Sequence, residues 1–304
     1  MSIIATNVSL TNLGVNNGAA AAAGDGKYTY DEMTALFMKK FSGEVYNAMR
    51  RKCLFKDLQR TRTIKNGKSA SFNYTGRMSA RYHERGTPIL GSNNPPIGQR
   101  VINIDDLLIA DIFIYDLEDA KLHFDVRKEY SHQLGQALAK RFDEKIARLG
   151  YLAARASATT ADHYGGTKLT HASAATDANE LRKLIFKAAE TFDTKDVPET
   201  DRHVIFKPAQ YYMMVQDTNL LNKDWGGRGE LATANLPMVA NIAVHKSNNL
   251  PNGQNITTPI AGENNSYTGD FTKSVALIMN KQAVGTVKMF DLAVEMSGHD
   301  YHVM

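Results

Sequence analysis

Residues 101–139 read VINIDDLLIADIFIYDLEDAKLHFDVRKEYSHQLGQALA, and the hydrophobic pattern changes part-way along this stretch. Residues 107–115 are mostly apolar, with β-branched and aromatic side chains, a composition typical of a well-buried strand. From 126 to 153, apolar residues recur every three or four positions, which predicts one amphipathic helix over 125–155. At 1.5 Å per residue this helix is about 46 Å long, longer than a typical small domain is wide. We expect it to act as a strut.

Just before this helix, the sequence has the two-residue period of β-strands. Residues 61–75 and 102–105 alternate apolar with polar side chains. Residues 76–100, between the two runs, are rich in Gly, Pro and Asn and hold few apolar side chains. The pattern predicts a long β-hairpin with a mobile tip. A connector of this size without its own core is usually either disordered or held by something outside its domain.

The rest of the sequence predicts an N-terminal arm and an α/β subdomain. Residues 1–30 are polar and alanine-rich, which indicates a flexible arm, and an amphipathic helix follows from Asp31 to about residue 51. Residues 156–176 are interpreted as a linker, beyond which helix and strand patterns alternate. The predicted elements there are helices from Asp177 and from Pro208, and strands at 202–207, 242–246, 274–279 and 287–296.

Composition excludes several classes of protein. The chain has 304 residues, with 36 Lys and Arg against 32 Asp and Glu, so its formal net charge is only +4. Its single cysteine, Cys53, can form neither an internal disulfide nor a cysteine-rich zinc site. No apolar run approaches the roughly 18 to 20 residues of a membrane span. The first basic residue is Lys27, so the N-terminus does not resemble a secretory signal, and we expect synthesis in the cytoplasm.

Three short motifs hint at chemistry, but each is incomplete. Residues 67–69 (GKS) match the end of a phosphate-binding loop, but the glycine required five residues before the Gly-Lys pair is replaced by Arg62. The acidic residues of 105–119 surround a single strand and turn, whereas a hydrolytic site needs groups that converge from several elements. The histidines in 299–302 lack a third fixed metal donor. We therefore expect no catalytic residue, no metal site and no cofactor, in a protein that is not an enzyme.

The charges are unevenly placed along the chain. Residues 60–100 hold eight basic residues and one acidic residue, a net charge of +7, whereas residues 105–129 hold three basic and eight acidic residues, a net charge of −5. A basic hairpin lying across the acidic region of a neighbouring molecule would be electrostatically complementary. Two alternatives stay open: both regions could be solvated faces, or the hairpin could bind nucleic acid by stacking Phe72, Tyr74 and Tyr82 on bases.

Four segments resemble the major capsid proteins of short-tailed, podovirus-type phages of the T-seven group, which have the Hong Kong 97 shell fold. The segments are residues 35–49 (ALFMKKFSGEVYNAM), 66–77 (NGKSASFNYTGR), the 101–139 stretch quoted above and 283–295 (AVGTVKMFDLAVE). They occur in the order found in that family, and the third is long and highly specific. Residues 202–215 are similar in pattern only.

The resemblance implies an α+β fold of the Hong Kong 97 type. Its parts would be an N-terminal arm with the first helix, an extended β-hairpin called the E-loop, a peripheral domain with a long spine helix, an axial α/β domain, and strands that return to the peripheral domain. The corresponding boundaries would be 1–60, 61–104, 105–176, 177–272 and 273–304. In this fold the E-loop lies over a neighbouring subunit, so the basic and acidic regions would become partners.

The resemblance also implies a function. The chain would be a major capsid protein that self-assembles, as pentamers and hexamers, into the icosahedral head shell of a tailed bacteriophage around double-stranded DNA. It would be a virion component assembled in the host cytoplasm, with a scaffolding protein, a portal and a decoration protein as partners, nonspecific proximity to DNA and no membrane contact. A cellular encapsulin-type shell of the same fold and a nucleic-acid-binding module are the alternatives.

Charged residues are the expected contacts between subunits. The hairpin would contribute Arg77, Arg81 and Arg85. The receiving surface on the peripheral domain would contribute Asp116, Glu118, Asp119 and Glu129.

Overall fold

The computed structural model describes most of the chain between residues 53 and 294. The described residues are 44–45, 47–49, 53–89, 91, 95–112, 126–158, 164–217, 220 and 235–294. They divide between two units, one made of Met1–Cys53, Leu108–Arg141 and Phe290–Met304 and the other of Leu54–Leu107 and Phe142–Met289. The expected N-terminal arm, the start of the first helix, and Asp116, Glu118 and Asp119 lie outside the described residues.

In the first unit, the described residues of the first helix pack against the N-terminal half of α4 (Val126–Arg155). A Cβ atom at Gly135 would lie 2.6 Å from the Val45 carbonyl oxygen and 2.7 Å from Ala48 Cβ, so this approach requires glycine. Beside it, Ser131 Oγ donates a hydrogen bond to Glu44 Oε2 at 3.1 Å. The helix predicted from the spacing of apolar residues is confirmed at these positions.

The predicted hairpin is present in the second unit. β2 (Ser69–Thr75) and β3 (Ile97–Asn103) pair antiparallel over their whole length. Phe72 and Ile102 pack against β10, because a Cβ atom at Gly285 would lie 3.3 Å from the Phe72 ring and 3.6 Å from Ile102 Cδ1. The apolar face predicted from the alternation is therefore the face that the hairpin uses against its own chain.

The strand predicted over 61–75 is two strands. β1 (Arg60–Thr63) pairs in parallel with β10 (Gly285–Lys288) and takes no part in the β2–β3 ladder. Between β1 and β2 the chain turns at Gly67, whose φ of +114° is readily adopted only by glycine. The turn redirects the chain, so the ladder with β3 begins only at Ser69.

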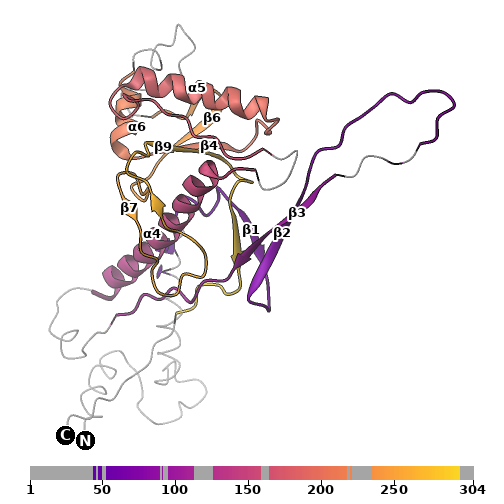
Figure 1. The fold of residues 1–304 in the computed structure, drawn as a ribbon. Helices are drawn as coiled ribbons and strands as arrows, with labels where there is room; N and C mark the ends of the chain where they lie inside the picture. The colour runs from indigo at the N-terminus through magenta and orange to yellow at the C-terminus, as the bar shows by residue number, and fades with distance from the viewer. Residues whose placement is uncertain are drawn as a thin grey trace, which may run out of the picture. The chain divides into compact units, whose positions relative to one another are not determined.

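A four-stranded sheet with the order β5-β6-β4-β9 lies at the centre of the second unit (Figure 1). β4 runs parallel to β6 and antiparallel to β9, and β5 is antiparallel to β6. A separate two-stranded ladder joins β7 to β8. The strands are β4 (Arg202–Phe206), β5 (Met238–Val239), β6 (Ile242–Lys246), β7 (Asn255–Ile256), β8 (Gly269–Asp270) and β9 (Ala276–Asn280).

The helices predicted over 125–155, from Asp177 and from Pro208 are confirmed. α4 runs for 30 residues, close to the expected 125–155. α5 (Ala178–Thr194) begins after Asp177, whose carboxylate accepts a hydrogen bond from the Asn179 amide and so caps the helix. α6 (Pro208–Val215) has its proline in the first turn, where no amide hydrogen is needed.

β4 separates two hydrophobic cores because its side chains alternate between the faces of the sheet. Val204 and Phe206 point into a core that contains residues of α5 and α6. Ile205 points the other way, into a core that contains residues from the C-terminal half of α4. All three side chains are fully buried. The strand is therefore apolar along most of its length, as expected for a strand that is covered on both faces.

The well-buried strand predicted at 107–115 is wrong for its described part. Residues 107–112 form no strand, and Leu107, Ile109 and Ile112 are 74%, 68% and 43% exposed. An apolar run indicates a tendency to be buried but carries no information on where the covering surface lies. The described part of the chain leaves these side chains uncovered. Residues 113–115 lie outside the described residues.

The strands expected at 274–296 are also arranged differently. β9 pairs with β4 and belongs to the sheet that carries α5 and α6, whereas we expected it to return to the peripheral sheet. β10, the last strand among the described residues, ends at Lys288, and residues 289–294 are irregular. A two-residue period makes a strand only where a partner supplies hydrogen bonds. The domain boundaries expected from the resemblance remain predictions.

The buried carboxylate of Asp143 provides a test of stability. It accepts hydrogen bonds from the amides of Leu54 and Phe55 at 3.0 and 3.2 Å and from the Asn249 side chain at 3.2 Å. Asp143→Ala would leave buried amides without this acceptor, so we expect a loss of about 2–4 kcal/mol in the free energy of unfolding. Urea denaturation measures it, with the exposed Asp57→Ala as the control. Equal stability of the two variants would contradict this role.

A histidine pair on the sheet makes stability depend on pH. His203 Nδ1 and His245 Nε2 lie 3.1 Å apart. Burial lowers the pKa of both histidines. For His203, the Asp201 charge opposes this shift and the Lys281 charge adds to it. For His245, the charge of His203 adds to the shift. The unfolded chain therefore binds more protons below about pH 6.5, and the fold loses stability as pH falls through that value.

We expect His245→Gln to reduce the loss of unfolding free energy between pH 7.5 and 5.5, measured by urea denaturation at both values. His132→Gln, on the exposed surface of α4, is the matched control and should lose as much stability as the unmodified chain. An unchanged pH dependence in His245→Gln would show that the pair does not contribute.

Candidate assembly interface

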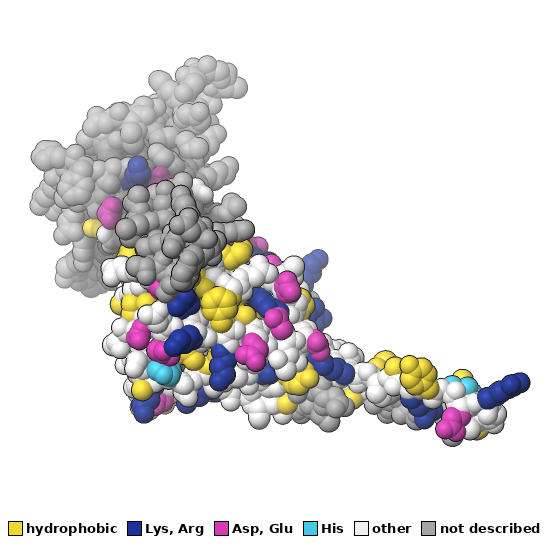
Figure 2. Space-filling model, turned by 90° about the horizontal axis from the view of Figure 1, so that it is seen from above, with side chains coloured by type: hydrophobic (Ala, Val, Ile, Leu, Met, Phe, Trp, Pro, Cys, Tyr) yellow, Lys and Arg dark blue, Asp and Glu magenta, His cyan; other side chains and the backbone are white. Residues whose placement is uncertain are grey.

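Beyond the hydrogen bond that closes the β2–β3 ladder, the hairpin exposes large apolar side chains. The Gly76 amide donates to the Pro96 carbonyl oxygen at 2.7 Å, which closes the ladder. Past this point Met78, Tyr82 and Ile89 are 72%, 103% and 76% exposed. Figure 2 shows the hairpin reaching out from its unit, with yellow apolar and dark blue basic side chains along it. Exposed apolar side chains grouped in this way are typical of a surface that another molecule covers.

Arg81 and Arg85 share this exposed part of the hairpin. Tyrosine and arginine are the residue types most often found at the energetic centre of protein interfaces. Each combines a large contact area with hydrogen-bonding groups, so an exposed Tyr82 between two arginines suits a surface that is apolar and acidic. This is the surface chemistry that the charge pattern predicts for a neighbouring copy.

The base of the hairpin is held by a network around Asp105. Its carboxylate accepts a hydrogen bond from Tyr267 at 2.5 Å and lies 3.2 Å from Lys145 Nζ on α4. The Asn264 amide and the Asn265 side chain both donate to it at 2.9 Å. Burial raises the pKa of Asp105, but the hydrogen bonds and the Lys145 charge outweigh burial and hold the pKa below its usual value.

A second set of hydrogen bonds fixes the backbone of the same segment. Asn265 donates through Nδ2 to the Asn103 carbonyl and accepts from the Asn103 amide at 2.7 and 3.2 Å. Asn264 donates to the Ile104 carbonyl at 2.8 Å. The Asp106 amide donates to the Gly262 carbonyl at 2.9 Å. The end of β3 is therefore bound to the 262–267 segment by side chains that satisfy its backbone groups.

The acidic residues predicted from the sequence separate into different roles. Asp105 and Asp106 belong to the base of the hairpin, so they are internal contacts. Glu129, on the first turn of α4, is exposed and accepts a hydrogen bond from Gln133 at 2.9 Å. Of the four residues expected on the receiving surface, it is the only one among the described residues. The structure therefore leaves the expectation for Asp116, Glu118 and Asp119 untested.

Arg77 differs from the other two hairpin arginines, because its partners are in its own chain. Its Nη1 lies 2.8 Å from Asp196 Oδ2, and its Nη2 donates to the Lys195 carbonyl at 2.9 Å. The guanidinium also lies over the Tyr164 ring, 4.5 Å from its centre. Sequence reasoning missed these contacts because the partners are more than 80 residues away and carry no local signal.

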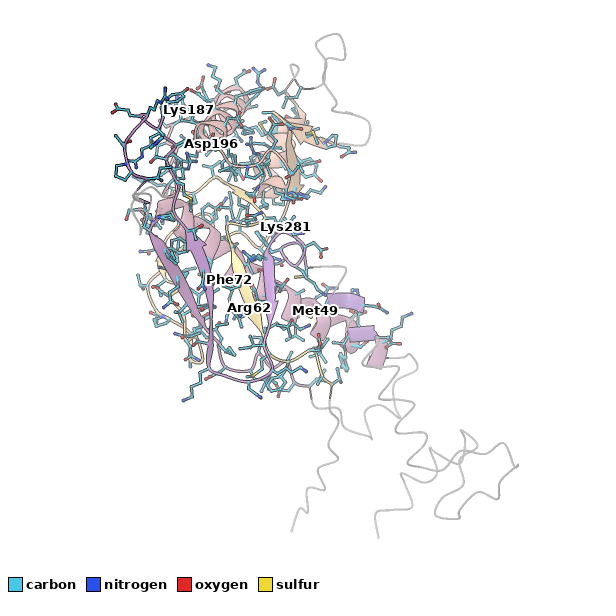
Figure 3. All side chains as sticks on the ribbon, turned by 90° about the vertical axis from the view of Figure 1, so that its right-hand side faces the viewer. Met49, Arg62, Phe72, Lys187, Asp196 and Lys281 are labelled. Atoms are coloured by element: carbon cyan, nitrogen blue, oxygen red, sulfur yellow. The ribbon has the colours of Figure 1, made fainter. Side chains whose placement is uncertain are left out.

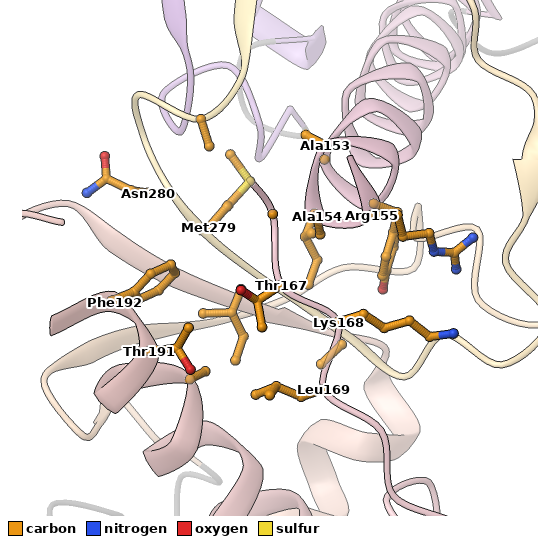
Figure 4. A pocket seen from close by; sticks show the side chains of 18 of the residues that line it. Ala153, Ala154, Arg155, Thr167, Lys168, Leu169, Thr191, Phe192, Met279 and Asn280 are labelled. Carbon is orange, nitrogen blue, oxygen red and sulfur yellow. The ribbon is translucent and has the colours of Figure 1, made fainter. Parts of the chain in front are cut away.

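Arg77 and Asp196 both line a cavity of about 1010 Å³. Figure 4 shows the cavity between the C-terminal end of α4, the segment through Thr167–Leu169 and the end of α5 near Phe192. Its lining combines apolar with hydroxyl and basic side chains. Among the described residues, no group of three His, Cys, Asp or Glu side chains could hold a metal ion. Within the same residues, no helix is long and apolar enough to cross a membrane.

Comparisons with known proteins agree with this architecture. A family model described as "Gp10A-like: Major capsid protein" matches residues 71–302. The major capsid proteins of Escherichia phage T7 and Enterobacteria phage T3 are 32% and 31% identical to this chain, in alignments that cover 93% of it and 87% and 86% of the relatives. This chain belongs to the Gp10A-like family of major capsid proteins.

Solved capsid structures show the same fold. The capsid of cyanophage P-SCSP1u is 41% identical to this capsid protein, with a TM-score of 0.73, and the match covers 83% of this chain and 80% of that one. The mature capsid of bacteriophage PhiM1 has a TM-score of 0.61 at 16% identity, covering 76% and 72%, and supports the fold alone. The capsid protein therefore has an α+β fold of the Hong Kong 97 type, as the resemblance implied.

Membership of this family confirms the expected function at its general level. The capsid protein is a structural component of the virion and forms the head shell of a tailed phage by assembling with copies of itself. A shell-forming role is non-enzymatic.

The network at the base of the hairpin predicts the effect of Tyr267→Phe. This change removes the hydroxyl that donates to Asp105 and leaves the ring in place. We expect a loss of about 1–2 kcal/mol in unfolding free energy, since a hydrogen bond to a charged group is lost. Hydrogen exchange at the amides of residues 103–106 should become about tenfold faster, which corresponds to a decrease of roughly 1.4 kcal/mol in the free energy of local opening. Tyr82→Phe, at a fully exposed position, should change neither value.

Proposed function

We propose that the hairpin of one capsid protein lies on a neighbouring copy and that this contact builds an icosahedral shell of pentamers and hexamers around double-stranded DNA. The supporting observation is the contrast within the hairpin. Its base is bound through Asp105, whereas Tyr82 near its far end is 103% exposed. A projecting arm with a fixed base and an uncovered apolar end gains stability only when another molecule covers that end.

We assign the contact between subunits to Arg81 and Arg85 on the hairpin. The receiving surface is the acidic region of the next copy, where Glu129 lies on the exposed face of α4. Asp116, Glu118 and Asp119 complete the proposed receiving surface. Arg77 is not assigned to this contact, because its guanidinium is engaged within its own chain. Each exposed ion pair contributes little alone, about 0–1 kcal/mol, so the shell depends on many such contacts formed together.

Further parts of the proposal rest on the family. The boundaries 1–60, 61–104, 105–176, 177–272 and 273–304 are proposed as arm, E-loop, peripheral domain, axial domain and returning strands. The partners are a scaffolding protein, a portal and a decoration protein. Assembly takes place in the host cytoplasm, contact with the packaged DNA is nonspecific, and the protein catalyses no reaction.

Reversing the hairpin charges tests the proposed contact. We expect the double variant Arg81→Glu with Arg85→Glu to form no shells, because it lowers the charge of the hairpin by four units and so makes the hairpin repel an acidic partner. The unfolding free energy of the free subunit should not change. Negative-stain imaging and sedimentation velocity count the shells. The control carries the same charge change at two exposed lysines elsewhere, Lys168→Glu with Lys187→Glu. Normal shells from the hairpin variant would overturn the proposed contact.

Nucleic-acid binding is the competing function, and the exposed Tyr82 between two arginines is the observation that favours it. It predicts that free subunits bind single-stranded DNA and that affinity falls steeply with salt. Tyr82→Ala should then weaken DNA binding by about 1–3 kcal/mol and leave shell assembly intact. Assembly through the hairpin predicts the opposite result for both measurements.

A further inference from the structure

The contact between Arg77 and the end of α5 holds the hairpin where it leaves its strands. Arg77 directly follows Gly76, the last residue with a backbone hydrogen bond across the hairpin. Its guanidinium reaches Asp196 at 2.8 Å and the Lys195 carbonyl at 2.9 Å. The contact therefore joins the start of the uncovered arm to a separate part of the same unit. Figure 3 labels Asp196, near the end of α5.

Asp196 occupies a backbone position that favours glycine. α5 ends with hydrogen bonds from the Asp196 amide to the Asp193 carbonyl and from the Val197 amide to the Phe192 carbonyl, at 3.0 and 2.9 Å. This pair of bonds is the Schellman motif, in which the residue at position 196 takes a left-handed conformation. Its φ is +53°. The backbone alone would favour glycine there, and the carboxylate that Asp196 supplies instead binds Arg77.

The surface that receives Arg77 is already organised without it. Lys195, the C-cap residue of α5, donates through Nζ to the Gly165 carbonyl at 2.7 Å and to Thr167. The 164–167 segment is thereby tied to the helix end, and Tyr164 lies under the guanidinium. A helix C-terminus carries a partial negative charge, which adds to the attraction for a cation. The site thus combines a helix end, a carboxylate and an aromatic ring.

The contact is exposed enough to open. The side chains of Arg77 and Asp196 are 47% and 72% exposed, so water competes for both charges. We propose that Arg77 and Asp196 are positioning residues, whose contact sets the direction in which the hairpin leaves its subunit to reach a neighbour. This inference rests on the proposed function. An exposed contact also allows the hairpin to adjust between neighbours in pentamers and in hexamers.

Asp196→Gly separates this role from a role in folding. It removes the carboxylate but gives position 196 the residue that its backbone favours, so the free subunit should unfold at the same or higher denaturant concentration. Asp201→Gly is the matched control. Asp201 is also exposed, has a φ of +59°, and lies outside the Arg77 contact. Arg77→Gln removes the charge from the other side of the pair.

Pulsed electron paramagnetic resonance measures the direction of the hairpin in full-length, unassembled subunits. Spin labels are placed on cysteines at Tyr82 and Lys187, both exposed, in a chain carrying Cys53→Ala. We expect the same distance distribution in the parent chain and in Asp201→Gly. In Asp196→Gly and Arg77→Gln the population of other hairpin directions should rise by roughly up to fivefold, the range for an exposed ion pair.

Assembly of unlabelled subunits then tests the consequence. We expect Asp196→Gly to give slower assembly and more misshapen particles than Asp201→Gly. An Asp196→Gly distance distribution identical to that of Asp201→Gly overturns the proposal, and so does normal assembly despite a broadened distribution. The distance measurement uses free subunits, so its result stands even if the charge-reversed hairpin variant shows that the proposed intersubunit contact is wrong.

Discussion

The uncovered half of the hairpin is the constraint on which this structure depends. Side chains such as Met78 and Tyr82 find no covering surface among the described residues of their own chain. Burial of a large apolar side chain is worth about 1.5–3 kcal/mol, and the single chain forgoes this stabilisation at several positions. The apolar residues of 107–112 are exposed in the same way. In the proposed assembly, a second copy covers these side chains.

The rest of the second unit gives the uncovered arm a rigid support. β4 carries one core on each face, and both cores are closed by helices of the same unit. Lys145 on α4 reaches Asp105 at the hairpin base, so the arm is attached to the helix that forms one of those cores. Arg77 adds a weaker, exposed contact farther along. Strong attachment at the base and weak attachment above it allow small changes in direction without loss of the fold.

Local features of the fold were predictable from the sequence, whereas contacts between distant segments were not. α4, α5 and the β2–β3 hairpin follow from periodicity and from a capping residue, which are encoded by neighbouring residues. The Asp105 network joins residues about 160 positions apart, and the local sequence around an acidic residue does not indicate such distant partners. The exposure of Arg81 and Arg85 followed from the lack of a core in their segment, but the intrachain role of Arg77 did not. The buried strand predicted at 107–115 is wrong over residues 107–112, because an apolar sequence does not indicate which molecule covers it.

Hydrogen exchange of the hairpin in two states tests the central claim most directly. Apart from the Thr87 amide, which donates to the Glu84 carbonyl, the amides of the described residues between Gly76 and Pro96 lie beyond the ladder, so they should exchange rapidly in dilute free subunits while β2 and β3 are protected. In assembled shells the same amides should become slow, because a neighbouring copy covers them. Slow exchange in the free subunit would show that the arm is covered by its own chain. Fast exchange in the shell would show that no neighbour covers it, and either result would contradict the account.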